Sequence, residues 1–336
     1  MLKKIPKWNL VLLVTLISEI VIFGLINPRF WNMNVLLNSF NDFIGIAIIA
    51  FFVTFVIITG GIDISGGSII GLTSVVAGIS SQVMGLNIWL AVVLAIVVGG
   101  LCGLLNGLFI AYAKVQAMVI TLGGMLLYSG IALVLVGISG ASTYEGISGF
   151  SQGFINLANG KLFGILPHSV VLFIVVFIIA YILLHRTRYG RYIYLTGINQ
   201  NAAEYSGIDT RKIITSTYVL SGLSAGLAGV ILTSYLGSAR ADFGGEYLMP
   251  ILTAIVLGGT LITGGKGGVV GTALACIIVG FLKLGLQMGG VQTQYIGLAI
   301  GLLLIISVAF LGIPNFKSNV SRLLGMKKSR GGNLNA

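Results

Sequence analysis

Charged residues are scarce in this sequence. Lys, Arg, Asp and Glu make up 8% of the 336 residues, whereas hydrophobic residues make up 57%. Between residues 43 and 185 the charged residues are Asp63, Lys114, Glu145 and Lys161. A water-soluble domain needs far more polar surface than this. The composition therefore argues against a soluble protein and predicts a chain embedded in a membrane.

Cysteine and histidine are rare as well, with two of each. Cys102 and Cys276 lie within apolar runs, so no disulfide framework or metal-binding spacing is visible. His168 and His185 stand at opposite ends of one apolar run and cannot share a metal. The glycines around Lys266 lack the P-loop spacing, so they do not indicate a nucleotide site. We expect no catalytic centre, metal or cofactor in this chain.

Apolar runs of about 20 residues, the length that spans a bilayer, recur along the chain. They predict an all-α polytopic membrane protein rather than the short alternating strands of a β-barrel. We expect one transmembrane domain, residues 1–336, with spans between about residues 10 and 311. The expected spans are Leu10–Ile26, Phe43–Thr59, Ile69–Val83, Ile88–Tyr112, Met118–Gly137, Ser169–Leu184, Ile213–Leu236, Leu248–Thr263, Val269–Leu286 and Tyr295–Leu311. The third is short, and a partly re-entrant third span would leave nine.

Basic residues are distributed unevenly about these spans. Ten spans place both termini on one side of the membrane. If that side is cytoplasmic, all but four of the 19 Lys and Arg residues lie there, the exceptions being Arg29, Lys161, Arg240 and Lys283. This bias is typical of cytoplasmic loops. We therefore expect cytoplasmic termini, including a basic tail of residues 312–336, and we do not interpret the net charge of +11 as nucleic-acid binding.

The segment 186–212 is a polar island in this apolar chain and is expected in the cytosol. Asn199 can cap a short helix, and Gly207 can end it in a left-handed conformation. One interpretation is a solvated loop with a helical turn, and the other is a lever on which a cytosolic partner pushes. The residues assigned to this coupling role are Asn199, Asn201, Ala202, Ala203, Glu204, Tyr205, Ser206 and Gly207.

A second polar stretch, GGIDISGGS, follows the second expected span. Asp63 in it caps the amides of the next helix together with Ser65 and Ser68, or alternatively contributes to the permeant path. The structural or gating residues assigned here are Gly60, Gly61, Asp63, Ser65 and Ser68. The paired glycines at 258–259 and 264–265 repeat the spacing of the pairs at 60–61 and 66–67, which is a weak sign of an internal repeat.

Two glycine rows predict close helix packing within the membrane. Their members are Gly99, Gly103 and Gly107 in one span, and Gly222, Gly226 and Gly229 in another.

Mid-membrane charge is limited to Glu19 in the first span, which is expected to face protein. A proton- or sodium-coupled carrier normally buries more such groups. We therefore expect energy to come from outside the chain. A stand-alone secondary carrier or channel remains the alternative, and a membrane-embedded enzyme is disfavoured because titratable residues are not clustered.

Four motifs in order resemble the ribose-type ABC sugar permease family. They are GGIDISGGS, VITLGGM, GRYIYLTGINQNAAEYSGI and LTAIVLGGTLITGGKGGVVGT, and the similarity extends from about Asn34 to Leu311. Further segments, such as INPRFWNMNVLLNSFNDFIGI and GLQMGGVQTQ, resemble the branch that imports autoinducer-2. Leu248 and Pro250 stand where the sugar-permease pattern usually has acidic residues, and Gly66 replaces a usual Val. These departures weaken a ribose or rhamnose assignment more than the family assignment.

The resemblance implies a subunit of an ATP-driven importer in a bacterial inner membrane, surrounded by lipid. Its expected partners are a second homologous permease, a cytosolic ABC ATPase that binds ATP and Mg²⁺, and a periplasmic or lipid-anchored binding protein. Segments 32–41, 144–150 and 240–246 are expected to dock the binding protein. The docking residues assigned are Asn32, Tyr144, Glu145, Arg240, Asp242 and Glu246. Substrate contacts were not assignable from the sequence.

Overall fold

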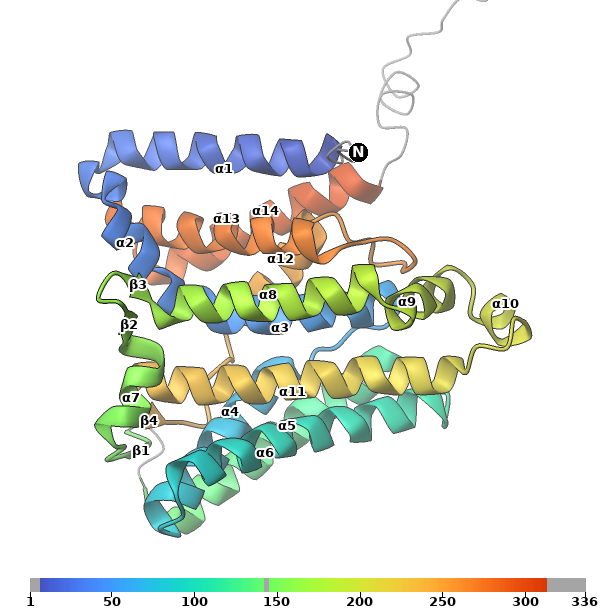
Figure 1. The fold of residues 1–336 in the computed structure, drawn as a ribbon, viewed down its shortest axis with the longest axis horizontal. Coiled ribbons are helices and arrows are strands. Elements are labelled where there is room, and N and C mark those ends of the chain that lie inside the picture. Colours follow the sequence, from blue (N-terminus) through green and yellow to red (C-terminus); the bar gives the residue numbers. More distant parts are fainter. Residues whose placement is uncertain (1–6, 142–144, 313–336) are drawn as a thin grey trace, which may run out of the picture.

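Long apolar helices make up most of the chain in the computed structural model, which describes residues 7–141 and 145–312 (Figure 1). The helices are α1 (Lys7–Ile26), η1 (Pro28–Trp31), α2 (Met33–Asn38), α3 (Phe40–Ile58), α4 (Gly66–Gly78), η2 (Ile79–Val83), α5 (Ile88–Ala111), α6 (Ala117–Ser139), α7 (Gln152–Asn159), α8 (His168–Arg186), α9 (Arg188–Ile198), α10 (Gln200–Tyr205), α11 (Thr210–Leu236), α12 (Leu248–Leu257), α13 (Val269–Met288) and α14 (Thr293–Gly312). Four two-residue strands complete the fold: β1 (Ile147–Ser148), β2 (Lys161–Leu162), β3 (Leu166–Pro167) and β4 (Ser238–Ala239).

Within the described ranges, eight helices are long and apolar enough to cross a membrane, and Leu248–Leu257 and Thr293–Ala309 are shorter apolar helices. The prediction of an all-α polytopic membrane protein is therefore confirmed. The predicted span Leu248–Thr263 is wrong in its end, because α12 stops at Leu257. Gly259, with φ +89°, turns the chain there.

The two ends of the bundle differ. Figure 1 shows α10 and both ends of the described chain at one end, which we call the α10 end. The opposite α7 end carries α2, α7 and the short strands. β1 pairs with β4, and β2 pairs with β3, both antiparallel. The connection between α6 and α8 thus holds a helix and three short strands.

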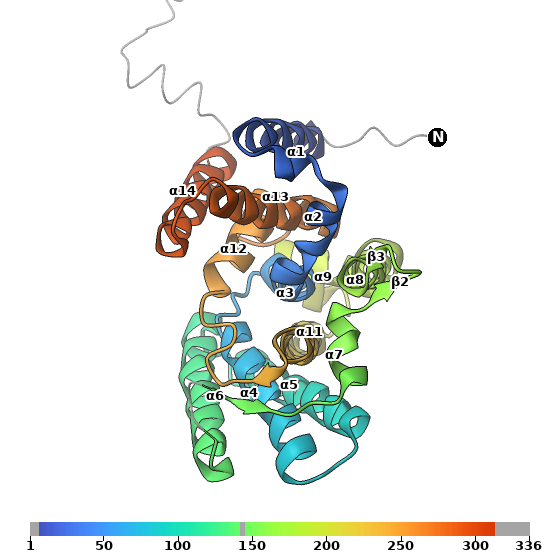
Figure 2. The ribbon, with the colours of Figure 1, turned by 90° about the vertical axis from the view of Figure 1, so that its left-hand side faces the viewer.

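Helices α3 and α11 form the centre of the bundle, with the other long helices around them (Figure 2). Nearly every residue of α3 is buried. The glycine row of α5 packs against that of α11: a Cβ at Gly103 would collide with the Tyr218 carbonyl, and one at Gly222 would collide with the Gly99 carbonyl. Gly229 instead packs against Ile70 of α4. Small residues allow this backbone contact in lipid, and the predicted packing role of the glycines is confirmed.

Candidate functional site

The polar island folds into two helices beyond the end of α8. Thr187 ends α8, and its hydroxyl oxygen accepts a hydrogen bond from the Gly190 amide at 3.3 Å, which caps α9. Helix α9 was not predicted from the sequence. Its buried residues Gly190, Ile193 and Thr196 follow a three-residue spacing, and this period is the signal that could have revealed it. A Cβ at Gly197 would collide with the Ile58 carbonyl, so α9 packs directly on the end of α3.

Helix α10 forms where the sequence predicts it. The Asn199 side chain accepts a hydrogen bond from the Ala202 amide at 3.0 Å, and Gly207 ends the helix with φ +82°. Figure 1 shows α10 projecting beyond the membrane-spanning helices. Ala203 is buried against the bundle, whereas Tyr205 is 94% exposed. The remaining residues assigned to coupling, Asn199, Asn201, Ala202, Glu204, Ser206 and Gly207, are exposed. The helix therefore presents a largely free outer face.

Glu204 is tied to the start of α11. Its Oε1 accepts hydrogen bonds from the Thr210 hydroxyl and from Gln200 Nε2, the latter at 3.4 Å. These bonds lower the pKa of the Glu204 carboxyl below its usual value, and the positive charges of Arg211 and Lys114 add to the shift. These bonds join α10 to the start of α11, which runs through the centre of the bundle.

A cavity of about 420 Å³ lies between α10 and the residues that follow the end of α3. Its lining includes Thr59, Gly60, Lys114, Gln200, Glu204 and Tyr218. A second cavity of about 240 Å³ borders Glu204 on the side of Tyr112 and Arg211. The Arg211 guanidinium lies 5.9 Å from the Tyr112 ring centroid, which links α11 to the end of α5. The two cavities therefore leave space between α10 and the α5–α6 turn.

Asp63 is the centre of a buried polar network. Its Oδ1 accepts hydrogen bonds from the Ser65 amide at 3.0 Å and the Ser65 hydroxyl at 2.7 Å. Its Oδ2 accepts one from the Ser221 hydroxyl at 2.7 Å. Asn106 donates to the Ser65 hydroxyl at 2.9 Å, and Tyr128 donates to Asn106 at 2.9 Å. Four segments of the bundle are thus joined around one carboxylate that is 3% exposed.

The predicted capping arrangement at this site is partly wrong. The Ser65 hydroxyl donates to Asp63 instead of capping the helix, and the Ser68 hydroxyl donates to the Ser65 carbonyl at 2.8 Å. The structure buries Asp63 against the middle of α11, where the Ser221 hydroxyl donates to it. Ser221, which donates to Asp63, and Asn106, which donates to Ser65, could not be found from the sequence, because they lie on helices distant along the chain.

The two glycine-rich stretches that repeat each other, 60–67 and 258–265, are in contact in the structure. Gly60 has φ +87° and Gly259 has φ +89°. Each glycine follows the end of a helix, and the two helix ends are closed by the same pattern of backbone hydrogen bonds. The Gly265 amide donates to the Ile58 carbonyl at 2.9 Å. Gly60 and Gly61 therefore lie at a junction between the ends of two helices, next to α9, and their structural or gating role stays a prediction.

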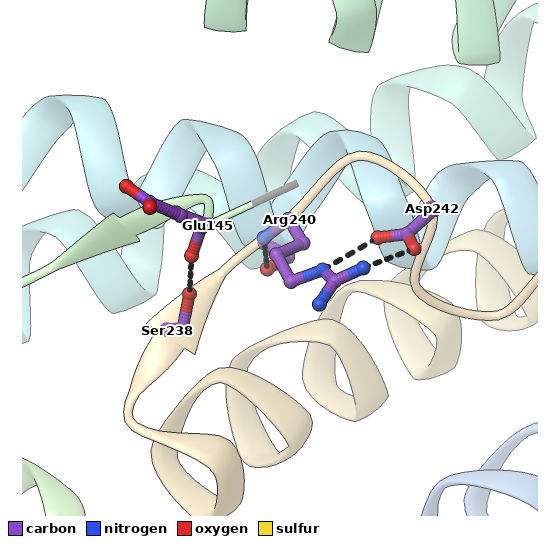
Figure 3. Close-up of polar contacts among 5 residues, drawn as sticks. Glu145, Ser238, Arg240 and Asp242 are labelled. Atoms are coloured by element: carbon purple, nitrogen blue, oxygen red, sulfur yellow. Dashed lines mark hydrogen bonds and ion pairs between the residues drawn. The ribbon is translucent and has the colours of Figure 1, made fainter. Parts of the chain in front are cut away.

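The residues assigned to docking are divided between two depths. Asn32, which caps α2, and Glu145 are exposed at the α7 end. Tyr144 lies outside the described residues. Figure 3 shows the Glu145 carbonyl, which accepts a hydrogen bond from Ser238 at 2.8 Å, while the Glu145 carboxylate points away from Ser238.

Arg240 and Asp242 form an ion pair on the chain that follows β4 (Figure 3). Arg240 Nε donates to Asp242 Oδ1 at 2.9 Å, and a terminal nitrogen donates to Oδ2 at 2.6 Å. From here the segment 239–247 runs inward along α4 and does not stay at the α7 end. A Cβ at Gly71 would collide with the Ala241 carbonyl, and one at Gly67 would collide with the Gly244 carbonyl. Asp242 and Glu246 therefore lie deeper than the sequence suggested.

Glu19 is buried, as expected, with an exposed fraction of 8%. Its carboxyl oxygens have no hydrogen-bond partner among the residues that the structure describes. In residues 7–141 and 145–312, no group of three or more His, Cys, Asp or Glu side chains could hold a metal ion.

Comparison with known proteins relates this chain to a family of membrane permeases. Residues 35–308 match the family described as branched-chain amino acid transport system, permease component. The chain is 43% identical over 320 residues to the "Autoinducer 2 import system permease protein LsrD" of Escherichia coli strain K12, covering 95% of this chain and 96% of the relative. It is 45% identical over 301 residues to the protein of the same name in Salmonella paratyphi B, covering 90% of each.

No solved structure matches the chain at a significant level. The family match and the relatives each extend over most of the chain. Together with the membrane-spanning helices, they identify a multi-pass protein of the inner membrane. The chain belongs to the family of branched-chain amino acid transport system permease components.

Proposed function

We propose that this chain is a permease subunit of an ATP-driven ABC importer and that the transported solute is autoinducer-2. The observation that carries the proposal is the 43% identity, over 95% of the chain, to a permease named for autoinducer-2 import. A sequence similarity of this extent includes α10 and the polar connections, and not only the apolar spans.

The proposed importer has three further components. A second homologous permease completes the pore, a cytosolic ABC ATPase binds ATP and Mg²⁺, and a periplasmic or lipid-anchored protein delivers the solute. The exposed outer face of α10, with Tyr205 at its end, supports docking of the ATPase. In this proposal the α10 end faces the cytosol, and the basic residues of its connections fit the charge bias of cytoplasmic loops.

Transport in this scheme is a population shift between an outward-open and an inward-open state. ATP binding drives the shift only if the ATPase contacts the two states with different affinity. The bonds of Glu204 to Thr210 give the contact a direct route into α11. Asn32 and Glu145, exposed at the opposite end, are the proposed contacts for the binding protein.

The test begins with purification of this chain from its native membrane in mild detergent and identification of the proteins that accompany it. Co-purification of a second permease and an ATPase is expected. The complex is then reconstituted into vesicles with the binding protein, and uptake of autoinducer-2, ribose and rhamnose is compared.

ATP-dependent uptake of autoinducer-2 in preference to both sugars is the expected result. Preferential uptake of ribose or rhamnose would retain the importer and overturn the solute. A chain that purifies alone and transports without ATP would overturn the importer and indicate a secondary carrier.

A further inference from the structure

The segment 239–247 enters the membrane from the α7 end. Its residues contact α4 in order: Ala239 lies against Gly78, Ala241 against Gly71, and Gly244 against Gly67. The Cα positions of Gly78 and Gly67 are eleven residues apart, or about 16 Å along a helix. The hydrocarbon core is about 30 Å thick. The non-helical chain therefore reaches about the middle of the membrane before α12 begins.

The length of α12 agrees with this depth. It has 10 residues, which is enough for about 15 Å, or half of the hydrocarbon core. The chain thus crosses the membrane in two halves, first as the segment 239–247 and then as α12. Gly67 and Gly71 make this possible, because their lack of a side chain lets the loop backbone lie directly on α4.

Charged side chains on this segment are exposed at membrane depth. The Asp242 side chain is 61% exposed, and Glu246 is exposed as well. Figure 2 shows the segment at the edge of the bundle between α6, which packs on α4, and α14, which packs on α12. Lipid is not a suitable neighbour for carboxylates, and irregular backbone at this depth occurs only where it is covered by protein or borders water.

We propose that Arg240, Asp242 and Glu246 line the aqueous translocation pathway, and that the two carboxylates hydrogen-bond the hydroxyl groups of a small uncharged polyol during its passage. This assignment of the solute contacts rests on the proposed import function, whereas the location of the pathway does not. It gives these three residues a role inside the membrane in place of docking at its surface.

The chemistry of the three side chains fits such a solute. Arg240 is held by both oxygens of Asp242, so its charge is already neutralised by a bidentate pair. Each carboxylate can accept up to about four hydrogen bonds, so Asp242 retains acceptor capacity for hydroxyl groups. Glu246 has no ion-pair partner among the described residues. The net negative charge favours neutral solutes and repels phosphorylated ones.

The experiment measures water access in the complete transporter, reconstituted into vesicles. Glu246→Cys and Asp242→Cys are compared with Leu126→Cys, whose side chain is 67% exposed in the middle of α6. The probe is a membrane-impermeant cationic methanethiosulfonate. The parent protein supplies the background, since Cys102 and Cys276 are both buried. Glu246→Cys remains informative if loss of the Arg240–Asp242 pair prevents assembly of the Asp242 variant.

We expect Glu246→Cys and Asp242→Cys to react at least about tenfold faster than Leu126→Cys, because thiols react as hydrated thiolates. Autoinducer-2 should slow the reaction at both positions, whereas inorganic phosphate should not. Reaction as slow as at Leu126→Cys, with and without ATP, would overturn the location of the pathway. Fast reaction without protection by the solute would overturn the contact.

Uptake by vesicles that contain the wild-type transporter distinguishes the proposed import function from the proposed location of the pathway. Absence of autoinducer-2 uptake there would overturn the proposed function, while the relative reaction rates would still decide whether the segment borders water. The solute that the vesicles do import then replaces autoinducer-2 in the protection experiment.

Discussion

Two polar segments of this chain, 186–212 and 237–247, have similar sequence character but opposite positions in the structure. Both are rich in charged residues, and each follows a long apolar helix. The first forms α9 and α10 beyond the end of the bundle. The second turns back and descends along α4.

The difference arises from the helix on which each segment packs and not from the segment itself. Helix α4 offers Gly67, Gly71 and Gly78 on the face that meets the second segment, so a bare backbone can lie on it. The first segment is helical and buries only small patches, such as Ala203. Polarity alone therefore does not place a loop outside a membrane, and the glycine spacing of a neighbouring helix has to be considered.

The largest effect is expected from Gly71→Leu. The new side chain would collide with the Ala241 carbonyl and force the second segment away from α4, at a cost of about 1–3 kcal/mol or more. Import and the yield of folded protein should fall sharply. Gly123→Leu in α6 is the matched control, because the space in front of Gly123 is open. Equal loss in both variants, measured by thermal unfolding in detergent, would contradict the packing explanation.

Asp63→Asn tests the other chain break that folds back into the bundle, between α3 and α4. The amide can accept at one oxygen only, so at least one of the donors from Ser65 and Ser221 loses its acceptor inside the protein. We expect a loss of about 1–3 kcal/mol in the free energy of unfolding. Ser221→Ala, which removes a single donor, should cost less. A variant as stable as the wild type in denaturant titration would show that the network does not hold this segment.

Asn199→Ala should loosen only the projecting segment. It removes the cap of α10, which is worth about 1 kcal/mol. Amide hydrogen exchange should accelerate in residues 200–207 and remain unchanged in residues 239–247. Asn201→Ala is the control, since its side chain makes no hydrogen bond among the described residues. Acceleration in both segments would mean that the two are coupled more tightly than their contacts indicate.

The smallest effect concerns pH at the same helix. The Glu204 pKa is lowered by bonds from Thr210 and Gln200, so the folded turn favours the carboxylate. The associated stabilisation is therefore present above the ordinary carboxyl pKa of 4.5 and is lost as pH falls through the lowered value. Exchange in residues 200–210 should rise over that range, and Thr210→Val should move the change to higher pH. A pH profile unaffected by Thr210→Val would contradict the assignment.

Much of this architecture could be predicted from local sequence. Apolar runs predict the spans, the glycine rows predict close helix packing, and Asn199 with Gly207 predicts α10. That the two rows pack against each other is known only from the structure. Each of these signals acts within one element or depends on a simple period. The orientation in the membrane and the docking roles stay predictions.

The features that were missed depend on contacts distant along the chain. Asp63 was expected to cap a helix, but Ser221, 158 residues away, draws it into the interior. The segment 237–247 was expected at the surface, yet Gly67 and Gly71 receive it at depth. No pattern within either segment encodes these partners.

The main proposal is that the ATPase acts on this permease through its contact with α10. The direct test is ATP hydrolysis by the reconstituted transporter that carries Glu204→Ala together with Tyr205→Ala. Stimulation by the solute-loaded binding protein should be lost while the variant still inserts and assembles with the second permease. Lys161→Ala with Phe163→Ala, an exposed pair at the α7 end, should retain stimulation. Normal stimulation and import in the α10 variant would contradict the account.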